Sequence, residues 1–578
     1  MTQASTPDSS VALPEQAAQK VRERRHERRI RARLLEVVPG SLTWILILSL
    51  FLLPIRYPRV VAWFVLSFDF YWMYRAIVLS TSVFISFGRM RRVVQIDWRQ
   101  RAFALADPQG RIDEIDASME RIKERVKSLH ASGQGLAAEG GEYELRTLSD
   151  ERRDLRHWLR TRAKNGDTTP IPDPSELYHV ALIPTYTEPY EKLHETLKAL
   201  AESDYPRDLR MVAIITRETD TQGRENVARL REVFGDQFLH FFHILDPLEP
   251  GVVIGKSSAM AYGGRWLYRK LVELNFDPAK VIVTDLDSDY RVHPQYLGYV
   301  TYSFITNEDR YHRLYQAVPM FHNNLWECPV VVRLVAVTTT QLQMWRLLTP
   351  EKLISFSSYS VSLQTVHEVD YWATDAIPED SRFYWKSYFK YSGRFQSVPL
   401  FMPIYGDAVR ARSYPRSLAQ QYLQIRRWAW GVTDIPYFIE NAIQHREIPF
   451  RDRADRLINL WVDHVNWAIA PFVLMFGSNV PLFLNEAFRP TPLGQQLPVY
   501  VSSMLTISLL SLVVLCFVEG EIAPPRPREW GIWMQIWTRI QWVMLPFGCV
   551  IFTNLPALDA QTRLMTGRYL EYTVTEKA

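Results

Sequence analysis

Three carboxylates follow a short apolar run in the middle of the chain. Residues 281–284 read Val-Ile-Val-Thr, and Asp285, Asp287 and Asp289 follow at every second position. Negative charge concentrated at the end of a buried strand is costly unless a cation or a hydrogen-bonding substrate offsets it. A divalent cation, Mg²⁺ or Mn²⁺, would be held by Asp287 and Asp289 and completed by substrate phosphate oxygens. A solvated acidic turn is the structural alternative, because Asp-x-Asp is common in turns.

A second acidic pair, Glu379 and Asp380, precedes an aromatic, helix-like run over residues 382–391. A carboxylate near the start of a helix is stabilised as the anion, and a well-placed one could accept a proton from a sugar hydroxyl. A simple helix cap is the alternative interpretation.

A third group of polar and aromatic residues, Gln424, Arg427 and Trp428, lies shortly before the C-terminal apolar stretches. The arginine fork suits phosphate, and the flat indole face suits a sugar ring. A Trp-Arg belt at a membrane interface is the alternative. Lys256 begins an apolar helical run, where it could contact a nucleotide or lie on the surface.

The elements that position these residues follow an alternating pattern. Short runs of branched or bulky apolar residues recur at 179–184, 210–216, 238–245 and 280–284, separated by helical patterns. Such runs are typical of buried parallel strands, so we predict an α/β domain with a mainly parallel sheet. Ligands of such sheets bind beyond the carboxyl ends of the strands, which is where the first carboxylates lie.

Apolar stretches flank this domain on both sides. Residues 42–87 indicate a transmembrane hairpin broken at 56–59, and the stretches 465–484, 498–518 and 541–555 follow the polar region. Basic residues cluster on both flanks of the hairpin, which predicts that the polar middle is cytoplasmic, at a bacterial inner or plasma membrane. Three C-terminal crossings would place the basic tail outside, so one stretch would be interfacial or re-entrant. The Trp-rich residues 531–541 are a candidate surface helix.

Residues 111–164 read as a charged helical hairpin. Apolar residues recur in steps of three and four from Ile112 to Leu129, as in a coiled-coil seam, and a Gly-rich break separates a second helix. We interpret this hairpin as a scaffold or a docking arm for a protein partner. The net charge of +4 does not favour nucleic acid as a partner.

These patterns divide the chain into six segments. They are a basic cytoplasmic N-terminal segment (1–40), a transmembrane hairpin (41–88), the charged helical hairpin with a linker (89–170), a cytoplasmic catalytic domain (171–455), C-terminal transmembrane and interfacial helices (456–558), and a tail (559–578).

Taken in order, the motifs resemble those of the membrane-integrated family-2 glycosyltransferases, the group that includes cellulose and hyaluronan synthases and ceramide glucosyltransferase. The matching segments are Ile183–Glu188 (first-strand motif), Gly255–Ala259 (Gly-Lys-Ala), Asp287–Asp289 (Asp-x-Asp), Glu379-Asp380 (Thr-Glu-Asp) and Gln424–Trp428 (Gln-x-x-Arg-Trp).

The resemblance implies a GT-A-like domain flanked by transmembrane helices, and an inverting, metal-dependent hexosyltransferase-like reaction in polysaccharide synthesis. The donor would be a nucleotide-diphosphate sugar, above all a UDP-sugar, and the acceptor would be a hydroxyl group of a glycan or a lipid. Membrane lipids would be further partners of the chain. The implied residues are Asp380, Glu379 and Arg427 for catalysis, Asp287 and Asp289 for the metal, and Glu188, Asp220, Lys256, Gln424 and Trp428 for substrate binding.

Three departures from the family pattern stand out. Residues 216–220 read Thr-Arg-Glu-Thr-Asp where the family carries an Asp-Asp pair, Pro378 replaces a threonine, and residues 356–360 replace a segment that is often Gly-rich. The altered Asp-Asp site best supports the alternative function, a non-catalytic membrane scaffold or sensor that binds nucleotide sugar, with the helical hairpin as its partner arm.

Overall fold

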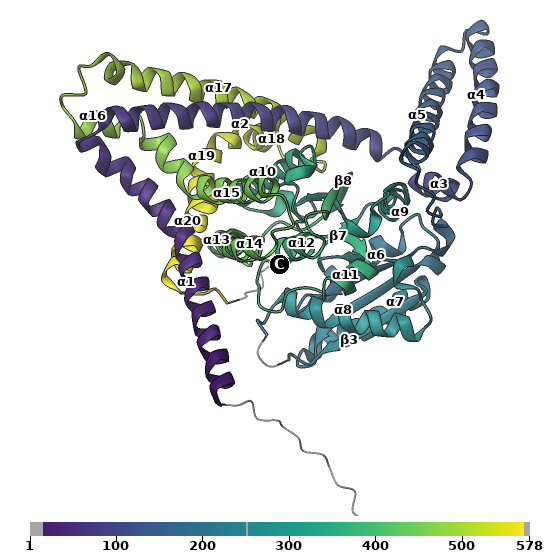
Figure 1. Cartoon of the computed structure of the whole chain (residues 1–578). Helices are drawn as coiled ribbons and strands as arrows, with labels where there is room; N and C mark the ends of the chain where they lie inside the picture. The colour runs from purple at the N-terminus through teal and green to yellow at the C-terminus, as the bar shows by residue number, and fades with distance from the viewer. Residues whose placement is uncertain (1–14, 250–251, 572–578) are drawn as a thin grey trace, which may run out of the picture.

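The computed structural model describes residues 15–249 and 252–571 (Figure 1). Residues 1–14 of the predicted basic segment and residues 572–578 of the predicted tail lie outside the described residues.

A single eight-stranded sheet forms the centre of the polar domain. Its order is β3-β2-β1-β4-β7-β6-β8-β5. The strands are β1 (Tyr178–Pro184), β2 (Arg210–Arg217), β3 (His240–Asp246), β4 (Val281–Asp285), β5 (Arg291–Val292), β6 (Arg313–Met320), β7 (Tyr359–Ser362) and β8 (Gln396–Tyr405). The four predicted apolar runs are β1 to β4, and they pair in parallel. The α/β class is thereby confirmed. Beyond β4 the sheet is mixed, because β7 runs antiparallel to both β4 and β6.

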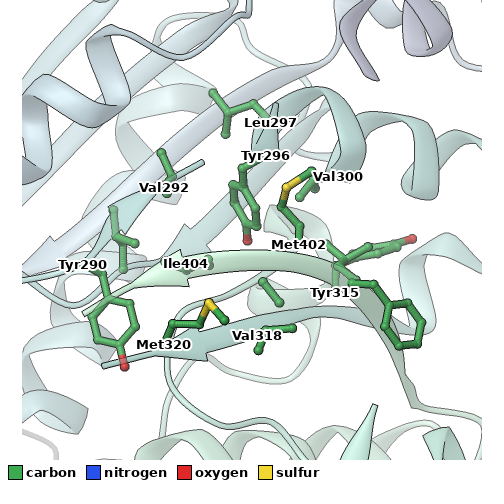
Figure 2. Close-up of a cluster of buried hydrophobic side chains, with 14 of the residues drawn as sticks. Tyr290, Val292, Tyr296, Leu297, Val300, Tyr315, Val318, Met320, Met402 and Ile404 are labelled. Carbon is green, nitrogen blue, oxygen red and sulfur yellow. The ribbon is translucent and has the colours of Figure 1, made fainter. Parts of the chain in front are cut away.

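Both faces of the sheet are buried, which explains why its strands read as continuous apolar runs. Val180 and Leu182 of β1 join one hydrophobic cluster, and Ala181 and Ile183 join the other. Figure 2 shows part of the second cluster, where aromatic and methionine side chains of β6, β8 and the neighbouring α9 fill the space beside the sheet.

Helices connect the strands and cover the sheet. The helices of this domain are α6 (Tyr190–Ala201), α7 (Thr221–Phe234), α8 (Lys256–Glu273), α9 (Tyr296–Thr306), α10 (Val330–Arg346), α11 (Leu363–Glu368), α12 (Glu379–Lys390), α13 (Tyr414–Ala429) and α14 (Asp434–Gln444). Helix α8 lies close against β2, since a Cβ atom on Gly263 would come within 2.2 Å of the Ile215 side chain. This approach fixes the start of α8, and with it Lys256, at the end of the strands.

Residues 108–165 form an antiparallel pair of helices that projects away from the sheet (Figure 1). They are α4 (Pro108–Ala131) and α5 (Gly135–Asn165), and they are joined to the domain by α3 (Trp98–Phe103). The apolar positions of the expected seam are buried between them from Ile112 to Val126.

Within the part of the chain that the structure describes, five helical segments are long and apolar enough to cross a membrane: residues 32–55, 58–93, 450–476, 492–522 and 532–566. They belong to α1 (Glu15–Leu52), α2 (Pro58–Val93), α15 (Phe450–Phe476), α17 (Pro492–Ile522) and a bent run of α18 (Ile532–Ile540), α19 (Leu545–Cys549) and α20 (Leu555–Thr566). The first two meet at a short turn, as expected, but then diverge (Figure 1). Helix α1 packs on α15 and α20, whereas α2 packs along α17 and α10.

The last of the five segments ends beside the first one. The Asn485 side chain donates hydrogen bonds to the carbonyl oxygens of Pro54 and Ile55, at 3.3 and 3.1 Å, so the turns after α1 and α15 share one end. Helix α17 leads away from that end. The Arg33 guanidinium donates to the carbonyl oxygen of Leu564 at 2.6 Å, so α20 finishes beside the start of the apolar segment 32–55, near the middle of α1. That one C-terminal stretch is interfacial or re-entrant stays a prediction.

Candidate active site

The loops that follow the parallel strands open into one cavity of 1850 Å³. Nine of the ten residues singled out from the sequence line it: Glu188, Lys256, Asp287, Asp289, Glu379, Asp380, Gln424, Arg427 and Trp428. Parallel strands bring their carboxyl ends to one edge, and α12 and α13 close the cavity from the other side. The cavity also extends between the helices that are apolar enough to cross a membrane.

Lys256 is at the centre of an acidic cluster. Its Nζ atom lies 2.7 Å from Asp287 Oδ1 and 3.1 Å from both Asp285 Oδ1 and Glu379 Oε1. Asp380 Oδ1 is 3.8 Å away. The two acidic segments, nearly a hundred residues apart in sequence, therefore meet around one ammonium group.

Burial and mutual repulsion change the protonation of this cluster. Burial by itself would lower the pKa of Lys256, but the surrounding carboxylates outweigh it and place the pKa well above its usual value. Burial raises the pKa of Asp285 to about 7, against the attraction of Lys256. Burial, followed by repulsion from Glu379, Asp285 and Asp287, likewise raises the pKa of Asp380 well above the usual carboxyl range. A carboxyl with a raised pKa is suited to proton transfer near neutral pH.

A strained turn at residues 357–358 forms hydrogen bonds to both acidic segments, 285–289 and 379–380. Ser357 and Ser358 both have positive φ angles, of 23° and 58°, a conformation that costs free energy in residues other than glycine. The turn places the Ser357 backbone N–H 3.1 Å from Asp380 Oδ2, and the Ser357 hydroxyl donates to Asp287. Ser357 thus orients Asp287 and Asp380 together.

The remaining acidic residues differ in their surroundings. The Thr185 hydroxyl donates to Glu188 at 2.7 Å, and burial raises the pKa of Glu188. Asp289 Oδ2 accepts a hydrogen bond from the backbone N–H of Asp407 at 3.0 Å. Both side chains face the cavity.

Asp220 is the one sequence candidate that does not line the cavity. Its carboxylate accepts hydrogen bonds from the backbone N–H groups of Gly223, at 2.9 Å, and Thr187, at 3.0 Å. The first bond caps α7, and the second holds the loop after β1 in place. In this structure Asp220 supports the site rather than facing it.

An ion pair stands at the end of β2, where residues 216–220 differ from the Asp-Asp pair of the family pattern. Arg217 forms a buried ion pair with Asp246, at the end of β3, and its Nη2 atom donates to Ser258 Oγ at 3.1 Å. Arg217 also lines the cavity. An ion pair between neighbouring strands therefore braces the start of α8 at the place where the family pattern has two acids.

Helix α13 presents Gln424, Arg427 and Trp428 to the cavity. The indole ring of Trp428 packs between Phe321 and Phe356, with ring-centroid distances of 5.9 and 5.6 Å. Phe356 directly precedes Ser357, so the aromatic wall and the acidic cluster are fixed by the same loop.

The acidic residues suit a cation that a substrate completes. Among residues 15–249 and 252–571, no group of three or more His, Cys, Asp or Glu is arranged to hold a metal by itself. Asp287 and Asp289 both line the cavity, however, and Mg²⁺ is commonly held by one or two carboxylates together with substrate phosphates. The donor set therefore fits Mg²⁺ or Mn²⁺ bound together with a diphosphate.

Two residues of the cluster had been given no role from the sequence: Asp285, although it was noted as one of three alternating carboxylates, and Ser357. Asp285 ends β4 and contacts Lys256, and its place directly after the apolar run was the available signal. Ser357 gave only a weak signal, since it stands in the segment where a Gly-rich sequence was expected and adopts the backbone conformation that glycine favours.

Comparisons with known proteins give likenesses of fold only. No protein-family model matches the chain, and no curated protein matches it. Solved structures that match include the mannosyltransferase PcManGT from Pyrobaculum calidifontis in complex with GDP-Man and Mn²⁺, with 15% identity, a TM-score of 0.37, and coverage of 69% of this chain and 93% of that chain. TarS residues 1–349 from S. aureus match with 13% identity, a TM-score of 0.30, and coverage of 68% and 93%. GalNAc-T7 with UDP, GalNAc and Mn²⁺ matches with 10% identity, a TM-score of 0.32, and coverage of 50% and 58%. These likenesses assign no substrate and no residue to this chain.

Proposed function

We propose that the chain is an inverting glycosyltransferase that moves a sugar from a nucleotide-diphosphate sugar to a hydroxyl group at the inner face of a membrane. The observation that carries the proposal is the meeting of Asp287, Asp380 and Lys256 at the carboxyl edge of the sheet. Asp287 is the candidate metal ligand, Asp380 the candidate base and Lys256 a cation for phosphate, and the three side chains meet in one cluster. This cluster lies in a cavity that continues between the proposed membrane helices.

Asp380 is the proposed base. It takes the proton of the acceptor hydroxyl as the oxygen attacks the anomeric carbon, and the bond from that carbon to the diphosphate breaks on the opposite face. The nucleoside diphosphate leaves with the electron pair, so the configuration at the anomeric carbon is inverted. Ser357 keeps Asp380 oriented during this step.

Asp287 and Asp289 would hold Mg²⁺ or Mn²⁺, which supplies charge neutralisation of the departing diphosphate. Lys256 and Arg427 add positive charge from the protein inside the same cavity. Trp428, fixed between Phe321 and Phe356, offers a flat face for the acceptor. A UDP-sugar is the donor that we propose first, and polysaccharide synthesis is the proposed setting.

Two further roles complete the proposal. Glu379, one residue before the base, helps to hold Lys256, and Glu188 and Gln424 face the donor space. Asp220 acts through Thr187 by fixing the loop after β1.

The test is turnover by the purified full-length protein with Mg²⁺ or Mn²⁺ and a set of radiolabelled nucleotide sugars. We expect the unaltered protein to release nucleoside diphosphate. Asp380→Asn should lose this release but should still bind the donor. Donor binding without any turnover would support the alternative of a membrane scaffold or sensor, and unchanged turnover in Asp380→Asn would remove the base assignment.

A further inference from the structure

The cavity is too large for the donor alone. Its 1850 Å³ exceed the roughly 300 to 1,000 Å³ of typical small-molecule sites. Beyond the acidic cluster it runs between α15 and α17, where its walls are apolar. The lining there includes Leu474 and Met475 of α15, Leu505 and Leu509 of α17, and Phe547 of α19. A second ligand with an apolar part therefore fits this end.

This end of the cavity opens to the outside of the helical bundle between α15 and α17. Met475, Leu509 and Phe547 line the cavity, yet each is at least half exposed. Helix α17 packs along α2, whereas α15 packs along α1 and α20, so the two walls belong to different packed groups (Figure 1). All of these segments are apolar enough to lie in a bilayer. Their exposed apolar side chains would face lipid chains, which could enter the cavity without first passing through water.

Between the apolar end and the acidic cluster lies a basic cluster. It consists of Arg75, from the middle of α2, Arg346, at the end of α10, and Asp463 of α15. Arg75 lies 3.4 Å and Arg346 lies 2.5 Å from the Asp463 carboxylate. Both guanidinium groups also lie over the Trp345 ring, at 5.2 and 5.0 Å.

The basic cluster carries an excess of positive charge on the cavity wall. Two guanidinium groups share one carboxylate, and Arg75, Arg346 and Asp463 all line the cavity. Charged groups at membrane depth are costly and commonly mark a substrate path. The arginine fork is suited to bidentate binding of phosphate.

Resting on the proposed function, we propose that the acceptor is a lipid in which a phosphate group lies between the apolar chains and a hydroxyl-bearing headgroup. The chains occupy the gap between α15 and α17, the phosphate binds Arg75 and Arg346, and the headgroup hydroxyl reaches Asp380. A base at Asp380 favours a hydroxyl as the reacting group, because a phosphate oxygen is already ionised near neutral pH and needs no base.

A short series of contacts and chain neighbours links the acidic cluster to the basic cluster. The Ser381 hydroxyl, next to the base, donates to Asp434 Oδ2 at 2.5 Å. Close to Asp434 in the chain, Gly431 lies against the ring of His464, which a Cβ atom would approach to 3.5 Å. His464 is the neighbour of Asp463 in α15. Asp434 and His464 both line the cavity, so the headgroup of a bound lipid would lie along them.

The first experiment compares acceptors for the full-length protein in lipid nanodiscs with a labelled donor. The acceptors are phosphatidylinositol, a polyprenyl-diphosphate-linked sugar, and an uncharged glycosyl diacylglycerol. We expect label in the lipid extract with one of the two phosphate lipids, and less than about a tenth of that with the uncharged lipid. The two phosphate lipids distinguish a glycerophospholipid from a polyprenyl carrier as the source.

Variants then test the basic cluster. Arg75→Gln and Arg346→Gln should each raise the KM for the lipid about tenfold and leave the KM for the donor within twofold, because one charge-assisted contact to phosphate is lost. Arg75→Lys should restore part of the loss. Arg153→Gln, on the exposed surface of the helical arm, is the control and should change neither KM.

A neighbouring pair of leucines tests the side opening without altering charge. Leu509→Trp should narrow the gap and slow transfer to lipid at least fivefold, whereas Leu510→Trp, at an adjacent exposed position that does not line the cavity, should not. Equal use of the uncharged lipid, or elongation of a water-soluble glycan that Leu509→Trp leaves unchanged, overturns the proposal. Donor hydrolysis with no transfer to either phosphate lipid also overturns the lipid-acceptor proposal but leaves the proposed function intact. No turnover with any acceptor or with water overturns both the lipid-acceptor proposal and the proposed function.

Discussion

The two charged clusters of the cavity are opposite in sign. In the acidic cluster, four carboxylates share the single ammonium group of Lys256, whereas in the basic cluster two guanidinium groups share the single carboxylate of Asp463. An acidic excess suits a cation, and a basic excess suits a phosphate. One continuous cavity can therefore bind a donor with its metal at the acidic cluster and an anionic acceptor at the basic cluster.

The largest expected effect is in the acidic cluster. Asp380→Asn keeps the shape of the side chain but removes the proton acceptor, so we expect transfer to fall by about 10² to 10⁴-fold with little change in donor affinity. Single-turnover transfer and equilibrium binding of the donor are the measurements. A fall of less than tenfold would assign the base to another residue.

Asp287→Asn comes next. The loss of a charged ligand should weaken Mn²⁺ binding in the presence of the nucleotide sugar by about 100-fold, as seen by electron paramagnetic resonance. Arg75→Gln, in the basic cluster of the same cavity, is the matched control and should leave the Mn²⁺ signal unchanged. An equal effect of both variants would contradict the division of the cavity into two sites.

The pH profile should report the acidic cluster. Because the pKa of Asp380 lies above the usual carboxyl range, Asp380 is protonated and inactive as a base below it, and transfer should rise with pH through a raised inflection. Lys256 lowers the pKa of Asp380, so Lys256→Met should move that inflection to higher pH, as well as slowing the reaction. If the inflection moved to lower pH in Lys256→Met, the contact of Lys256 with Asp380 could not be the cause of the pH dependence.

A smaller effect is expected at the aromatic wall of the cavity. Trp428→Ala removes a flat surface held by Phe321 and Phe356, and we expect the KM for the acceptor to rise about tenfold, with the KM for the donor nearly constant. Trp428→Phe should recover most of the affinity. A rise confined to the donor KM would place Trp428 on the donor side instead.

The smallest effect on transfer is expected in the helical arm. Ile115→Ala, at a buried seam position, should lower the free energy of unfolding of α4 and α5 by about 2 to 4 kcal/mol, while transfer stays within twofold. Hydrogen exchange of residues 108–165 and a transfer assay check the two parts. A large loss of transfer would show that the arm is coupled to the cavity.

Much of the fold could be predicted from the sequence because its signals are local. Apolar runs of strand length marked β1 to β4, and steps of three and four marked the seam of α4. Strand ends placed Asp287 near the predicted site, since the carboxyl ends of parallel strands share an edge. The mixed half of the sheet escaped prediction, because strands such as β7 and β5 are too short to give a clear pattern.

By itself the sequence determined which residue types were available and which short elements carried them, because burial and periodicity act within one strand or helix. Only the tertiary structure decided that Asp285 and Ser357 belong to the acidic cluster, that Asp220 supports a loop, and that Arg75 meets Asp463. These contacts join residues far apart in the chain. They depend on how helices pack across the sheet and the bundle, and a local pattern carries no record of that packing.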